Sequence, residues 1–118
     1  MIDRYTRPRM SAIWDLQHKY EIWLEVELQA CAAFERGGQI PRGTSARIRK
    51  KAKIDVPRIA EIEKVTKHDV IAFLESLMDS VGPEHRFLHM GLTSSDIVDT
   101  SLAVQMTEAL DLILEDLN

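Results

Sequence analysis

Residues 95–118 contain no glycine or proline, and their apolar side chains recur at the three- and four-residue spacing of one helix face. That face carries Val98, Leu102, Met106, Ala109, Leu110, Ile113 and Leu117. The pattern predicts a long helix that opens at a capped start near Thr93. No glycine or other C-cap follows before Asn118, so we expect this helix to continue in the natural protein.

The earlier part of the chain shows the same helical period. Ser11 can cap a second long helix, buried on more than one side, which Gly37-Gly38 and Pro41 would end. Shorter amphipathic helices are predicted over residues 44–53, 55–65 and 70–81. The sequence has no run of alternating β-branched residues and no Asn-Gly or Asp-Gly hairpin turn. The prediction is therefore an all-α fold.

Composition limits the classes of function. Hydrophobic residues make up 45% of the 118 residues and charged residues 29%, as in globular proteins that fold. Fifteen basic and nineteen acidic residues leave a net charge of -4, which gives no general attraction for nucleic acid or an anionic membrane. The N-terminus lacks the apolar stretch of a signal peptide, so we expect a cytoplasmic protein. The single cysteine, Cys31, is expected to be a small core residue.

The segment Thr93-Ser94-Ser95-Asp96 has two interpretations. It can be a capping box, in which Thr93 and Asp96 satisfy each other's backbone N–H groups. It can also be an anion site, because a helix N-terminus offers free N–H groups and a positive dipole end to a carboxylate or phosphate. Both interpretations stay open on the sequence alone.

A second candidate site is Lys67-His68-Asp69, which is predicted at or just before the start of the helix over 70–81. Asp69 can orient the imidazole of His68, and Lys67 adds a positive charge for an anionic substrate. The alternative is that Asp69 is only a helix N-cap. The four histidines show no metal-ligand spacing, and the sequence predicts neither a metal nor a cofactor.

The pattern His89-x-Gly91-x-Thr93-Ser94-x-Asp96-Ile97-x-Asp99-Thr100 closely resembles the first signature of the adenylosuccinate lyase branch of the fumarase/aspartase superfamily. Residues 4–8, 10–14, 23–27 and the tetrad Lys67-His68-Asp69-Val70 are also similar to that branch, so the resemblance covers nearly the whole chain. It implies that residues 1–92 form a small N-terminal helical domain. Residues 93–118 would then begin a central bundle of long helices that assembles a homotetramer.

The resemblance implies a β-elimination that releases fumarate from adenylosuccinate, giving AMP, and from the succinyl-carboxamide ribotide, giving AICAR. The carbanion formed beside a carboxylate needs preorganised donors, which Thr93 and Ser94 would supply. By the same resemblance, the other substrate-binding residues are Arg4 and Tyr5 at the nucleotide and its phosphate, Lys67, His68 and Asp69 on the nucleotide side, and His89 near the phosphate.

His68 is expected to be either a general acid or a positioning residue, since the family has another histidine, in a Thr-His-Gly motif, that better suits the acid. That motif and the loop with the family's catalytic serine are absent from these residues. Family active sites also draw side chains from three subunits, so we expect the isolated chain to be inactive and to self-associate through residues 95–118. The alternatives are a carboxymuconate cycloisomerase-type relative and a non-catalytic helical interaction module.

Overall fold

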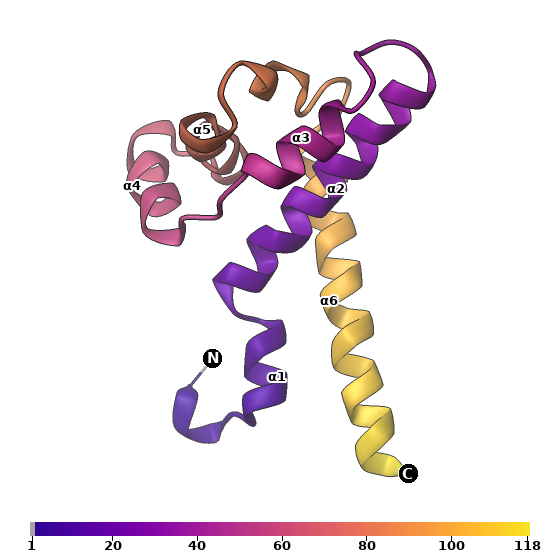
Figure 1. The fold of residues 1–118 in the computed structure, drawn as a ribbon. Coiled ribbons are helices and arrows are strands. Elements are labelled where there is room, and N and C mark those ends of the chain that lie inside the picture. The colour runs from indigo at the N-terminus through magenta and orange to yellow at the C-terminus, as the bar shows by residue number, and fades with distance from the viewer. Residues whose placement is uncertain (1) are drawn as a thin grey trace.

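The computed structural model describes residues 2–118, which form six α-helices and two short 3-10 helices (Figure 1). In chain order these are η1 (Asp3–Tyr5), α1 (Pro8–Ile13), α2 (Leu16–Arg36), α3 (Thr44–Lys51), α4 (Val56–Thr66), α5 (Asp69–Val81), η2 (Gly82–Phe87) and α6 (Ser94–Leu117). Residues 2–118 contain no β-strand, which confirms the predicted all-α fold. No helix within that range is long and apolar enough to cross a membrane.

An aromatic cluster joins α2 to α5 at the centre of the core. Tyr20 and Trp23 of α2 meet edge to face at 5.2 Å between ring centroids, and Phe73 of α5 stacks on Tyr20 at 5.8 Å. Trp23 and Phe73 are only 2% and 0% exposed. Each large ring buries apolar area that small aliphatic residues could not cover, so this cluster fixes how α5 docks on α2.

The single helix predicted from Ser11 onward is wrong, because the chain breaks at Trp14 and Asp15. Asp15 adopts an extended conformation, so α1 ends at Ile13 and α2 begins at Leu16. Gln105 of α6 donates from Nε2 to the Ile13 carbonyl at 2.8 Å, and its side chain is buried. A carbonyl that the break frees is thereby satisfied, and α1 can turn to follow α6.

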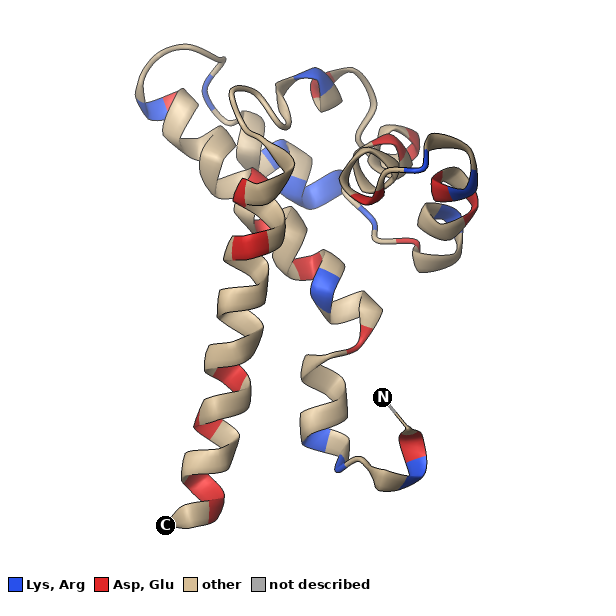
Figure 2. Cartoon of the chain, turned by 180° about the vertical axis from the view of Figure 1, so that it is seen from behind, with Lys and Arg blue, Asp and Glu red and all other residues tan. Residues whose placement is uncertain are grey.

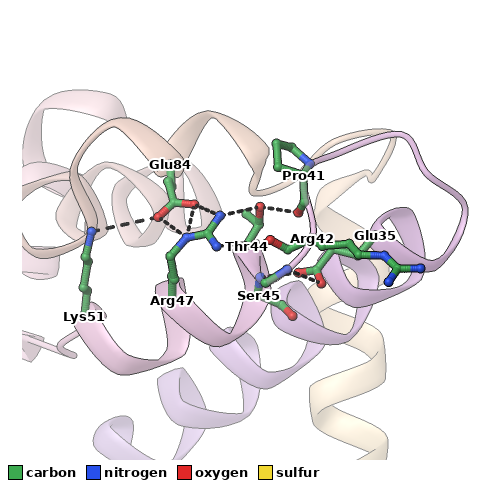
Figure 3. A network of polar contacts seen from close by, with 9 residues as sticks. Glu35, Pro41, Arg42, Thr44, Ser45, Arg47, Lys51 and Glu84 are labelled. Carbon is green, nitrogen blue, oxygen red and sulfur yellow. Dashed lines mark hydrogen bonds and ion pairs between the residues drawn. The ribbon is translucent and has the colours of Figure 1, made fainter.

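A carboxylate from α2 caps α3 (Figure 3). Glu35 accepts hydrogen bonds from the backbone N–H groups of Gly43, at 3.1 Å, and Ser45. The Ser45 N–H lowers the pKa of Glu35 below its ordinary value. Gly43 is the N-cap with φ of +81°, a conformation that glycine adopts without strain. The predicted opening at Thr44 or Ser45 is therefore confirmed, although the cap comes from another helix.

The packed face of α6 is not its most apolar face. Ile97, Ser101, Gln105 and Ala109 are buried against the rest of the chain. Most of the predicted apolar stripe is exposed by 45–76%, namely Leu102, Met106, Leu110, Ile113 and Leu117. The C-terminal half of α6 extends away from most other helices, beside α1, and touches the start of α2 where Glu108 pairs with His18 (Figures 1 and 2). Accordingly, the radius of gyration is 15.8 Å, above the roughly 13.5 Å of a compact chain of this length.

The aromatic cluster leads to a stability prediction. Replacing Phe73 by alanine should lower the free energy of unfolding by about 3–5 kcal/mol, because a buried ring is lost and a cavity remains. Val65 is 84% exposed on α4, and Val65→Ala should change stability by less than about 0.5 kcal/mol. Urea unfolding followed by circular dichroism measures both. Equal effects of the two substitutions would contradict this description of the core.

Candidate active site

Two helix N-termini meet at the candidate residues that the sequence analysis named. His68 is the N-cap of α5, and Ser94 is the first residue of α6. The Ser94 hydroxyl lies 3.4 Å from Nε2 of His68. The starts of α5 and α6 therefore lie side by side, and each contributes the positive end of a helix dipole. Such a junction can bind an anionic group.

The position of His68 defines its chemistry. Its Nδ1 accepts a hydrogen bond from the Ile71 backbone N–H at 3.2 Å, so Nδ1 carries no proton in this conformation. A neutral ring must then carry its proton on Nε2, the atom that faces Ser94. In this arrangement the imidazole presents an N–H donor to the junction, as a general acid or an anion-binding group requires.

The residues beside His68 have different roles. Lys67 ends α4 with φ of 53°, which turns the chain into α5 within two residues. Asp69 accepts from the Val70 N–H at 2.8 Å, and its carboxylate lies 3.7 Å from Nδ1 of His68. The interpretation of Asp69 as the N-cap is therefore wrong, because the imidazole of His68 occupies that position. Lys67 is exposed and available to an anion near the junction.

At the start of α6 the capping box is present, and Ser94 lies outside it. Asp96 Oδ2 accepts from the Thr93 backbone N–H at 2.8 Å. The capping-box interpretation is thus confirmed without excluding the anion site. Ser94 keeps its hydroxyl directed at His68 while Thr93 and Asp96 complete the helix end.

His89 lies in the segment that leads into α6, and a buried carboxylate holds it. Oε1 of Glu27 lies 2.6 Å from Nδ1 of His89, and Oε2 accepts from the His89 backbone N–H at 2.7 Å. Glu27 is 0% exposed. The sequence did not single out this carboxylate as a site residue. The available signal was an acidic residue on the buried face of α2, between Trp23 and Cys31.

Arg4 and Tyr5 lie far from this junction. The guanidinium of Arg4 sits over the Tyr5 ring at 4.8 Å, and Tyr5 lines a pocket with Leu112 and Asp116 near the C-terminal end of α6. Ion pairs of Arg7 with Asp116 and of Arg9 with Glu115, the latter at 2.7 Å, hold the N-terminal segment there. Because a helix rises 1.5 Å per residue, Ser94 and Leu112 are separated by roughly 27 Å. One chain therefore does not bring all predicted residues to one ligand.

Among residues 2–118, no group of three or more histidine, cysteine or acidic side chains is placed to hold a metal ion. That the protein needs neither metal nor cofactor stays a prediction.

No family model matches the chain. It is 47% identical to adenylosuccinate lyase of Bacillus subtilis over 99% of its own length and 27% of that protein. It is also 47% identical to adenylosuccinate lyase of Aquifex aeolicus, over its whole length and 28% of that protein.

The chain spans about a quarter of the length of the adenylosuccinate lyases that it matches. Two solved structures related to this enzyme superfamily share the fold. A fumarate lyase from Mesorhizobium covers 88% of the chain with a TM-score of 0.79 and 25% identity. The 3-carboxy-cis,cis-muconate lactonizing enzyme of Pseudomonas putida covers 99% with a TM-score of 0.84 and 28% identity. The chain spans 25% and 28% of those two proteins. The residues assigned from adenylosuccinate lyase stay predictions, as does the division into domains at residues 92 and 93.

The role of His68 as the N-cap of α5 can be tested by measuring stability alone. His68→Ala should lower the free energy of unfolding by about 1 kcal/mol, because the first turn of α5 loses its cap. His68→Asn should keep nearly all of it, since asparagine is a good N-cap residue. Chemical unfolding of the two variants measures the difference. Equal losses in both would show that the Nδ1 contact with Ile71 does not stabilise the helix.

Proposed function

We propose that this chain is the N-terminal quarter of an adenylosuccinate lyase, which eliminates fumarate from adenylosuccinate and from the succinyl-carboxamide ribotide. The products would be AMP and AICAR, and the enzyme would act in the cytoplasm. The observation that carries the proposal is 47% identity to curated adenylosuccinate lyases along essentially the whole chain. The solved lactonizing enzyme is only 28% identical over a similar span, which makes a cycloisomerase the weaker alternative.

The junction of α5 and α6 suits the chemistry of this elimination. Removing the proton beside a succinyl carboxylate builds extra negative charge on that carboxylate, and preorganised donors stabilise it. Ser94 offers its hydroxyl and a free N–H of the helix start, and His68 offers Nε2–H. Lys67, Thr93 and Asp69 complete the surroundings on the substrate side. In this scheme His68 donates to the substrate as an acid or as a positioning group.

The site needs more than this chain supplies. The Arg4 and Tyr5 pair, which would bind the nucleotide phosphate, lies at the opposite end of α6 from Ser94. We therefore propose that one copy contributes Arg4 and Tyr5 while another contributes the junction, in a homotetramer. The residue that removes the proton would come from the remaining three quarters of the enzyme. On this proposal the isolated chain is inactive.

The catalytic part of the proposal is tested with the full-length enzyme by following fumarate release from adenylosuccinate by ultraviolet absorbance. Ser94→Ala should lower kcat by about 10²–10³-fold, because one donor to the developing charge is lost. His68→Asn should lower the rate while the fold stays intact. Ser95→Ala removes a neighbouring exposed hydroxyl and should leave the rate within about threefold. An inactive wild type would refute the proposal.

The exposed face of α6 predicts self-association. Full burial of one of its exposed apolar side chains stabilises an association by about 1.5–3 kcal/mol before ordering costs. Four such side chains are Leu102, Met106, Leu110 and Ile113. The chain should therefore sediment as a dimer or a higher oligomer at micromolar concentration. Replacing Met106 and Leu110 by glutamate should shift it toward monomer without loss of helicity. A clean monomer of the wild-type chain at high concentration would contradict the expectation.

A further inference from the structure

Glu27 is a carboxylate in the buried core, where a charged side chain is energetically unfavourable. Its side chain is 0% exposed on the same face of α2 as Trp23, Leu28 and Cys31. Removing a carboxylate from water is unfavourable unless its hydrogen bonds to water are replaced. A core that served stability alone would be at least as well served by leucine or methionine at this position. The carboxylate therefore calls for a reason beyond packing.

Both hydrogen bonds that compensate Glu27 come from one residue. Oε2 accepts the backbone N–H of His89 at 2.7 Å, and Oε1 pairs with Nδ1 of its ring at 2.6 Å. His89 also has φ of 60°, a left-handed conformation that a residue with a side chain adopts at a cost. Two contacts to one carboxylate fix the backbone and the ring of His89 together, 62 positions away in sequence.

The contact determines which nitrogen of His89 is available. A carboxylate only accepts, so Nδ1 must carry the proton of this bond. The Nδ1 edge of the ring faces a carboxylate that solvent does not reach, yet the His89 side chain is 23% exposed. Nε2 lies on a different edge of the ring from Nδ1 and points away from that carboxylate. When the ring holds a second proton, Nε2–H is a charge-assisted donor with a fixed direction.

The ring belongs to the segment that enters the candidate active site. His89 precedes Thr93 by four residues, and the segment between them leads directly to the N-terminus of α6. Resting on the function proposed above, we propose that Glu27 is a positioning residue that aims Nε2 of His89 at the phosphate of the nucleotide substrate. Glu27 itself does not touch the ligand and acts through the imidazole.

Steady-state kinetics of the full-length enzyme test this role. Glu27→Gln keeps the shape but satisfies only one of the two donors with its single carbonyl. It should raise KM for adenylosuccinate about tenfold, the effect of misplacing one hydrogen bond to a charged group. The value of kcat should change by less than about threefold. With succinyladenosine, which lacks the phosphate, KM should be the same for the wild type and the variant.

Thr44→Val is the matched control. Thr44 is also 0% exposed, and its hydroxyl bonds only within α3 and the turn before it. Its loss should lower stability without changing KM. A purely structural role of Glu27 would make the two variants behave alike.

His89→Asn keeps the test decisive if Glu27→Gln fails to fold. The asparagine amide can donate to Glu27 in place of Nδ1–H, and asparagine tolerates the left-handed conformation, but it lacks Nε2. It should fold normally and show the same rise in KM. The double variant should match His89→Asn alone, because Glu27 acts through the ring.

The outcomes separate the two proposals. A wild type that releases no fumarate overturns both the function and this inference. An active wild type with unchanged KM in a folded Glu27→Gln, wild-type KM in His89→Asn, or additive effects in the double variant overturns the inference alone.

Discussion

The docking of α5 against α2 determines where the chemistry of this chain can lie. Tyr20, Trp23 and Phe73 lock the two helices together, and the first turn of α5 is thereby held next to the first turn of α6. A helix start is a weak anion site by itself, because water competes for its N–H groups. Two helix N-termini that meet, with an imidazole and a hydroxyl between them, form a site whose hydrogen-bond donors have fixed directions. The core and the candidate active site are thus parts of one packing arrangement.

Local patterns predicted the elements well because capping and periodicity are local properties. Asp55 accepts from the Arg58 N–H at 3.0 Å as an N-cap residue does, α2 ends at the predicted Gly37, and α5 ends at Val81, the last residue of its predicted range. The break at Trp14 and Asp15 escaped prediction because neither residue is a helix breaker. It is stabilised by Gln105, which is distant in sequence, and such a contact leaves no trace in the local pattern.

The site residues divide in the same way. The meeting of His68 with Ser94 follows from two helix starts that the sequence marked, although only the fold could bring them together. Glu27 went unrecognised because an acidic residue on an amphipathic helix is usually solvated, and its burial depends on the docked segment around His89. The family resemblance named Arg4 and Tyr5 as binding residues, but it did not predict where they lie in the fold. Their separation from the junction depends on the length of α6 and on ion pairs at its far end.

The C-terminal half of α6 packs only Glu108, Ala109 and Leu112 partly or fully against the rest of the chain and turns an apolar side outward. This has a thermodynamic consequence. Within one chain, that half contacts α1, the N-terminal segment and His18 of α2, which lies 2.7 Å from Glu108. Any partner that covers Leu110 and Ile113 adds a binding term to the folding equilibrium, and this term grows with the logarithm of partner concentration. The melting temperature of this half should therefore depend on how much protein is in the tube, while that of the aromatic core does not.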